Sequence, residues 1–131
     1  MTGLRRLTPE TIRAPFARYV HGIEVPAGAR LLFTSGQLGI APDDHVPEDA
    51  AAQAEICFRA IGDVLAAAGM GPQDIVRINA FVTDRAHMKP YMEVRDRFMN
   101  GHPPASTLVV VSGFTRPDFK VEVEVTAAKV D

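Results

Sequence analysis

The chain has 131 residues and a mass of 14.2 kDa, which predicts a single domain, residues 1–131, because domains usually run to roughly 100–200 residues. Its 47% hydrophobic and 23% charged residues are typical of a folded globular protein and exclude a disordered one. The net charge of −2 and the pI of about 6.1 argue against a nucleic-acid partner, because nucleic-acid-binding domains usually have a pI above about 9.

Cysteine, histidine and apolar residues exclude further classes of protein. Cys57 is the one cysteine, so the chain can form no internal disulfide. The four histidines lie far apart, without the short spacing of zinc ligands, and we expect no metal. No apolar run reaches the roughly 18 residues of a membrane span. The first residues include arginines but no apolar segment of a secretory signal, so we expect a cytoplasmic protein with no membrane partner.

The first predicted elements are two strands, residues 19–25 and 30–35. Proline and glycine in residues 26–29 indicate a turn between them, so we expect the two strands to form a hairpin. Gly36 follows the second strand, a position where glycine often marks a bulge or a close approach to the backbone.

The next predicted element is a helix that opens at Pro47 and ends at Gly69, since proline is favoured in the first turn of a helix and glycine after the last. Apolar side chains recur at helical spacing and predict one buried stripe, made of Ile56, Ala60, Ile61, Val64, Leu65 and Ala68. Cys57 lies beside this stripe, which indicates a small core residue rather than a nucleophile.

The second half of the chain predicts three strands, residues 74–83, 107–111 and 120–128, and a helix from Pro90 to residues 100–101. For the inner face of that helix the sequence leaves two alternatives: Met92, Arg95 and Met99, or Tyr91, Val94 and Phe98. The resulting order, β-β-α-β-α-β-β, is that of an α+β domain.

Two helices can cover only one face of such a sheet. The other face is expected to carry apolar side chains from both central strands: Ile75, Phe81 and either Leu108 and Val110 or Val109 and Val111. Exposed apolar patches of this kind mark interfaces, so we expect self-association to bury this open face.

Polar residues at strand ends and on the last strand are candidates for chemistry. Glu122 and Glu124 share the face opposite three valines, where burial in an oligomer would raise a carboxyl pKa and favour proton transfer. Ser35 and Gly36 could hold an anion or a carbonyl oxygen, and Ser106 could bind a ligand. The alternatives are a solvated strand face, a strand-end bulge, and a hydroxyl that satisfies local backbone groups.

Several segments, in this order and at this spacing, resemble the RidA (YjgF) family: LLFTSGQLGI, a helix ending in AAAG, DIVRINAFVTD, YMEVRDRFM, PPAS before a strand, and FKVEVEVTA. The resemblance covers residues 16–128. It implies a chorismate-mutase-like fold with a mixed sheet, and a homotrimer with small-molecule clefts between subunits. It also implies hydrolysis of reactive enamines and imines to 2-oxo acids and ammonia, in the cytosol and without a cofactor.

The resemblance assigns cleft roles to residues at matching positions. Tyr19, Ser35 and Gly36 would contact the substrate. Glu122, the first glutamate of the V-E-V-E pattern, would be the catalytic residue that positions the hydrolytic water.

Three other family positions differ in this chain. Ser106 stands where the resemblance implies an arginine that binds the substrate carboxylate, Leu108 where many members have cysteine, and Met92 where asparagine is frequent. Because a charge-assisted hydrogen bond contributes about 1.5–3 kcal/mol, loss of the arginine predicts a cleft that favours a neutral or differently shaped ligand. Arg116 and Arg18 are the candidates for a substitute positive charge.

Two functions therefore stay open for the cleft. One is a deaminase-type hydrolase of an imine, an enamine or a related small carbonyl derivative. The other is a binding or regulatory module that holds a small metabolite without turnover. Ribonuclease activity, attached to some family members, is disfavoured by the acidic pI, and chorismate-mutase chemistry by serine at position 106.

Overall fold

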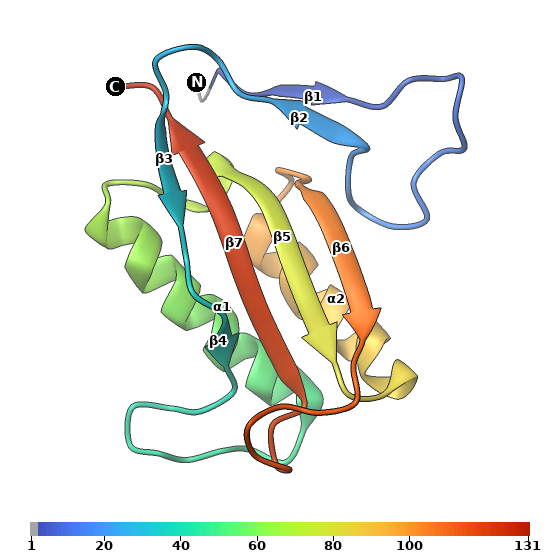
Figure 1. The fold of residues 1–131 in the computed structure, drawn as a ribbon, viewed down its shortest axis with the longest axis vertical. Helices are drawn as coiled ribbons and strands as arrows, with labels where there is room; N and C mark the ends of the chain where they lie inside the picture. The colour runs from blue at the N-terminus through green and yellow to red at the C-terminus, as the bar shows by residue number, and fades with distance from the viewer. Residues whose placement is uncertain (1–2) are drawn as a thin grey trace.

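The computed structural model describes residues 3–131, which form a five-stranded mixed sheet, a separate two-stranded ribbon and two α-helices (Figure 1). The large sheet has the order β3-β7-β5-β6, in which only β5 and β6 are parallel, and β4 pairs with β7 beyond β3. In chain order the elements are β1 (Arg5–Leu7), β2 (Gly22–Glu24), β3 (Arg30–Phe33), β4 (Gln37–Leu38), α1 (Ala50–Ala67), β5 (Ile75–Val82), α2 (Met88–Met99), β6 (Ala105–Val110) and β7 (Val121–Lys129).

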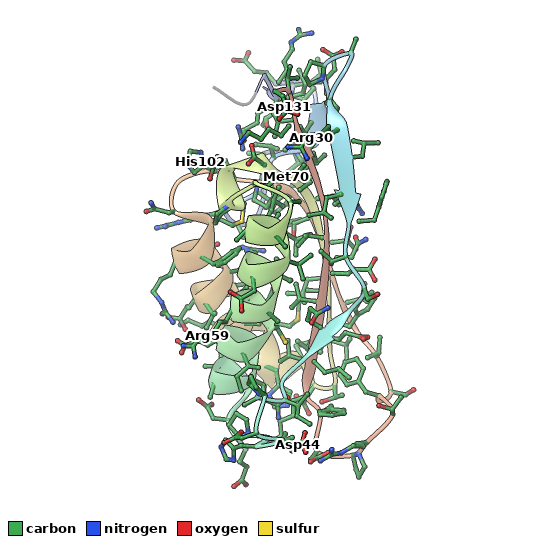
Figure 2. The ribbon with its side chains drawn as sticks, turned by 90° about the vertical axis from the view of Figure 1, so that its left-hand side faces the viewer. Arg30, Asp44, Arg59, Met70, His102 and Asp131 are labelled. Carbon is green, nitrogen blue, oxygen red and sulfur yellow. The ribbon has the colours of Figure 1, made fainter. Side chains whose placement is uncertain are left out.

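Both α-helices lie on the same face of the large sheet. Figure 1 shows α1 and α2 behind the strands, and the side view of Figure 2 shows them on one side of the sheet seen edge-on. The α+β class, the mixed sheet and the one-sided helix layer are therefore as the sequence predicts. Within residues 3–131, no helix is long and apolar enough to cross a membrane.

The last strand, β7, places its side chains as the alternating sequence predicts. Val121, Val123 and Val125 are at most 3% exposed and point into the core between the sheet and the helices. Glu122 and Glu124 point to the opposite, open face because successive side chains of a strand alternate. β7 lies in the middle of the sheet, between β3 and β5, so its three valines form the centre of the core.

Helix α1 is rotated slightly from the predicted stripe. Ile61 and Leu65 are buried as expected, whereas Ile56 is only half-buried. The ring of Phe58 instead lies in the helix interface, with its centroid 5.8 Å from that of Tyr91 and 4.9 Å from that of Phe98. The buried line of the helix consists of Ala50, Gln53, Ala54, Cys57, Phe58, Ile61 and Leu65.

The predicted hairpin between residues 19–25 and 30–35 is wrong. β2 pairs antiparallel with β1, and β3 pairs with β7. Gly28, in the left-handed region at φ 82°, lies in the turn between the two strands. β3 thereby lies along β7, where Leu32, opposite Ala127, packs against the core. The pairing of β3 therefore follows from the burial of Leu32 beside the distant strand β7, and not from the turn at residues 26–29.

Helix α1 begins at another residue than predicted, whereas α2 begins near Pro90, as expected. α1 starts at Ala50 rather than at Pro47, whose carbonyl accepts a hydrogen bond from the side chain of Gln53. α2 starts at Met88, so Pro90 falls in the first turn, where a missing N–H breaks no helical hydrogen bond. Its buried side chains combine the two alternative faces: Tyr91, Val94, Arg95 and Met99.

Ile75 was expected on the open face, and this expectation is also wrong. The register of β5 against β7 shifts between Ile75 and Arg77, and Ile75 is fully buried in the core. The bulge therefore gives Ile75 the same facing as Ile78, although three positions separate them.

The open face of the sheet mixes apolar and polar side chains. Leu31, Phe33 and Val109 are 57%, 69% and 39% exposed and project from the two edges of the sheet. Between them, Arg77 donates to Asn79 at 2.9 Å and to Thr107 at 2.6 Å. Large exposed apolar side chains beside an ordered polar network are features of surfaces that contact another protein.

Candidate functional site

Glu122 and Gly36 lie against each other at the open face, on neighbouring strand segments. Glu122 is paired with Leu38 of β4 on one side and with Phe81 of β5 on the other. A Cβ atom added to Gly36 would lie 2.7 Å from the Glu122 carboxyl carbon, inside any real contact distance. Glycine at position 36 thus lets the backbone approach the carboxylate, and the exposed Ser35 precedes it.

The surroundings of Glu122 favour its protonated form more than water does. The pKa of its carboxyl is raised above the ordinary value, first by partial burial and second by the negative charge of Glu124. The Glu124 carboxylate accepts a hydrogen bond from Asn79 at 3.3 Å, whereas the Glu122 carboxyl group has no hydrogen-bond partner among the described residues. Of the two glutamates, Glu122 is therefore the one free to exchange a proton with a ligand or with water.

Replacement of Gly36 by alanine should push the Glu122 carboxylate out of position. Because a displacement of about 1 Å can cost about 100-fold in rate, we expect Gly36→Ala to lower kcat/KM by about 10- to 100-fold, without loss of the fold, for a reaction in which the Glu122 carboxyl takes part. Gly113→Ala is the matched control, since a Cβ at Gly113 meets nothing within 4 Å. Equal activity of the two variants in a steady-state assay would contradict a role for this contact.

Tyr19, Ser106 and Leu108 meet elsewhere, around one cavity that we call the Ser106 cavity. The segment before β2 is held there by Val20, which donates its N–H to the Pro104 carbonyl at 2.9 Å and bridges to the first residue of β6. The cavity has a volume of about 230 Å³ and is lined by Phe16, Ala17, Tyr19, Met88, Met92, Arg95, Ser106 and Leu108.

Arg95 is the lining residue that the sequence did not identify as functional. Its side chain is 2% exposed, and its Nε donates to Asp96 Oδ1 at 3.1 Å. Nη2 lies 3.0 Å from the same oxygen but is buried and forms no hydrogen bond within the part of the chain that the structure describes. The only sequence signal was its place in one of the two alternative inner faces of the helix.

The two arginines proposed as substitutes lie elsewhere. Arg116 forms a two-pronged pair with Asp118, at 3.1 and 2.6 Å, in the turn before β7. Arg18 lines a neighbouring cavity of about 250 Å³ together with Asp96 and His102. Neither lines the Ser106 cavity, so the positive charge there belongs to Arg95.

The Ser106 cavity and the Glu122 carboxylate lie on opposite faces of the sheet. Ser106 is paired with Ile78 of β5, and Glu122 is paired with Phe81 of the same strand. Ile78 and Phe81 are three positions apart, so their side chains, and those of their partners, point to opposite faces. One chain thus brings Tyr19, Ser106 and Leu108 together and Gly36 and Glu122 together, but does not join the two groups.

Neither a metal site nor an activated cysteine adds to the residues around the Ser106 cavity or to Gly36 and Glu122 within residues 3–131. Within residues 3–131, no three His, Cys, Asp or Glu side chains gather as a metal site would require. Burial, and secondarily the charge of Glu122, raises the pKa of the Cys57 thiol to about 12. A thiol with that pKa is a poor nucleophile near neutral pH, in agreement with the core role expected for Cys57.

Comparisons with known proteins agree with this architecture. The family profile described as Endoribonuclease L-PSP matches residues 11–129. "Putative reactive intermediate deaminase TdcF" of Escherichia coli K12 is 31% identical over 126 residues, which cover 92% of this chain and 95% of that protein. The 2-iminobutanoate/2-iminopropanoate deaminase of the same organism is 29% identical over 129 residues, 95% of this chain and 98% of the relative.

Solved structures show the same fold. YyfB of Yersinia pestis, a protein of unknown function from the Rid family, superposes with a TM-score of 0.82 at 23% identity, over 95% of this chain and 98% of that one. TdcF crystallised with bound serine superposes with a TM-score of 0.72 at 29% identity, over 88% and 91% of the two chains. The chain therefore belongs to the Endoribonuclease L-PSP family, the family of the RidA and YjgF proteins.

Proposed function

We propose that this protein is a deaminase-type hydrolase of a reactive imine or enamine, acting in a cleft between subunits. The observation that carries the proposal is the close approach of Gly36 to Glu122, a carboxyl whose pKa is raised and which has no hydrogen-bond partner among the described residues. The deaminase names of family members at about 30% identity support the reaction class. The serine bound to TdcF supports a small-molecule ligand.

The reaction needs one proton acceptor and one water molecule, but no oxidant or reductant. Glu122 would accept a proton from water while the water oxygen bonds to the carbon of the protonated imine and the C=N π electrons move to nitrogen, which gives a neutral carbinolamine. Return of that proton to the nitrogen makes ammonia the leaving group. As the C–N bond breaks, the hydroxyl oxygen forms the carbonyl and gives its proton to Glu122, which passes it to solvent. Tyr19, Ser35, Gly36, Ser106 and Leu108 would contact the substrate.

The assembly we propose is the homotrimer that the family resemblance implies. Residues on opposite faces of one sheet can share a ligand only when another copy completes the site, so each cleft would lie between two subunits. The Ser106 cavity of one subunit would then meet the Glu122 carboxylate of the next. The apolar side chains of Leu31, Phe33 and Val109 on the open face would be covered in the same contact.

We expect the purified protein to have three times the 14.2 kDa mass of one chain in light scattering. Phe33→Glu should dissociate the assembly, because a charge would replace an exposed apolar ring on the open face. Arg59→Glu is the control, since Arg59 lies on the helix side of the molecule (Figure 2). A wild-type monomer at micromolar concentration would contradict the trimer.

Ammonia release tests the proposed reaction. An amino-acid oxidase generates an imine from an amino acid, and the assay compares the rate of ammonia release with and without the protein. Acceleration above spontaneous hydrolysis is the expected result. A protein that is stabilised by a 2-oxo acid in a thermal shift but accelerates nothing would instead be the binding or regulatory module.

A further inference from the structure

We propose that Arg95, on α2, binds the carboxylate of the ligand in the Ser106 cavity. The inference rests on the proposed function for the ligand's general class, and it names a binding residue that the sequence did not identify. It also changes the expected ligand. Serine at position 106 alone predicts a neutral ligand, whereas a guanidinium in the same cavity predicts an anion.

The first observation is that the Arg95 guanidinium is buried while part of its hydrogen-bonding capacity is unused. Arg95 is 2% exposed, yet among residues 3–131 its side chain makes one hydrogen bond, from Nε to Asp96 Oδ1, and its buried Nη2 makes none. Leaving a buried donor unsatisfied costs about 1–3 kcal/mol, and more when the group is charged. Sharing one carboxylate oxygen uses only part of the five-donor guanidinium. A ligand with two acceptor oxygens would satisfy the remaining donors.

The second observation is the chemistry of the cavity that Arg95 lines. Arg95 is the one charged residue in its lining, and Asp96 is not part of that lining. The hydroxyls of Tyr19 and Ser106 add two possible hydrogen-bond donors, while Met92 and Leu108 make the remaining wall apolar. A cavity with donors at one end and apolar walls suits a small molecule with one anionic group.

The third observation favours a carboxylate over a phosphate. A single arginine, already partly neutralised by Asp96, offers less than one net positive charge to a ligand. A carboxylate carries one negative charge on two coplanar oxygens, which match the planar fork of a guanidinium. The cavity of about 230 Å³ also limits the ligand to a small metabolite.

The helix holds Arg95 in this position from two sides. The guanidinium carbon lies 5.9 Å from the ring centroid of Tyr91, one turn earlier on α2, and Asp96 follows it in the chain. Ser106 on β6 lines the same cavity with a small, uncharged side chain. The positive charge in this cavity therefore comes from Arg95 on α2, and not from a residue of β6.

Binding of 2-oxobutanoate and of its uncharged amide tests the proposal by calorimetry on the full-length protein. Wild type should bind the acid more tightly than the amide. Arg95→Gln should weaken binding of the acid by about 10- to 200-fold, the equivalent of 1.5–3 kcal/mol, and leave the amide unchanged. Arg97→Gln is the matched control, because Arg97 is exposed on the same helix and pairs with Glu55 at 2.8 Å.

Two further variants keep the test decisive if Arg95→Gln unfolds. Asp96→Asn removes the competing carboxylate and should tighten binding of the acid. Ser106→Arg in the Arg95→Gln background returns a guanidinium to the cavity and should restore binding. Equal affinity of wild type for acid and amide, an unchanged acid-to-amide ratio in Asp96→Asn, or tighter binding of inorganic phosphate than of 2-oxobutanoate would overturn the proposal.

The calorimetric readout separates this proposal from the proposed hydrolysis. Discrimination between acid and amide that depends on Arg95, without any ammonia release, would uphold the carboxylate site and refute the hydrolase. Ammonia release with the same KM for a carboxylated imine in wild type and in folded Arg95→Gln would uphold the hydrolase and refute the carboxylate site.

Discussion

Glu122→Gln should lower kcat for ammonia release by about 100- to 10,000-fold, the usual contribution of a general acid or base. Glutamine has nearly the same shape as glutamate and fits beside Gly36, but its amide cannot accept the proton of the attacking water. Substrate binding should change much less than kcat, because the proposed substrate contacts are other residues and glutamine keeps the size of the side chain in the cleft. Steady-state kinetics of ammonia release, with circular dichroism as the check on folding, measure both effects.

Glu124→Gln is the control for this substitution, and it has its own pH signature. Activity requires Glu122 to be ionised, so activity is lost as the pH falls through its raised pKa. Removal of the Glu124 charge removes one of the causes of that raised pKa, so the acid limb of kcat/KM should move to lower pH. Unchanged activity in Glu122→Gln, or equal losses in both variants, would rule out Glu122 as the base.

Gln53→Leu should lower the free energy of unfolding by about 3–5 kcal/mol, because several buried hydrogen bonds disappear at once and each leaves a group that costs about 1–3 kcal/mol. The fully buried amide of Gln53 donates to the carbonyls of Pro47 and Asp118, both at 2.8 Å. Its oxygen accepts from the N–H of Lys120 at 2.8 Å. One side chain thus joins the approach to α1, the turn before β7 and the start of β7.

Urea denaturation measures this loss against Gln73→Leu, a matched substitution at an exposed position that should stay within about 0.5 kcal/mol of wild type. Gly39→Ala should act through the same amide, since its Cβ would lie 2.6 Å from Gln53 Cγ. Similar stability of Gln53→Leu and Gln73→Leu would show that these hydrogen bonds contribute little.

The sequence predicted those parts of the fold that depend on local periodicity. The alternation of valine and glutamate identified β7 and both of its faces, and the helical spacing of Ile61 and Leu65 identified α1. Strand pairing was harder to predict, because it depends on burial against residues that are distant in the sequence. The turn at residues 26–29 predicted a hairpin, whereas β3 pairs with β7, where Leu32 packs against the core.

The same limit applies to the site. Gly36 and Glu122 belong to segments whose register follows from the sheet, and the structure brings them together. Arg95 could not be identified because the apolar pattern of α2 was too weak to fix its rotation, and a charged residue is rarely expected in a core. The binding role proposed for Arg95 depends on two features of the structure, the unsatisfied Nη2 donor and the cavity that Arg95 lines.

The central position of β7 also constrains when the protein can fold. β7 comprises residues Val121–Lys129, so the middle strand of the sheet is synthesised after β3, β4, β5 and β6. Until it leaves the ribosome, β3 and β5 lack the partner that both share, and their edges stay open to other chains. The sheet can therefore close only after β7 has been synthesised, through pairings such as that of residue 30 with residue 129.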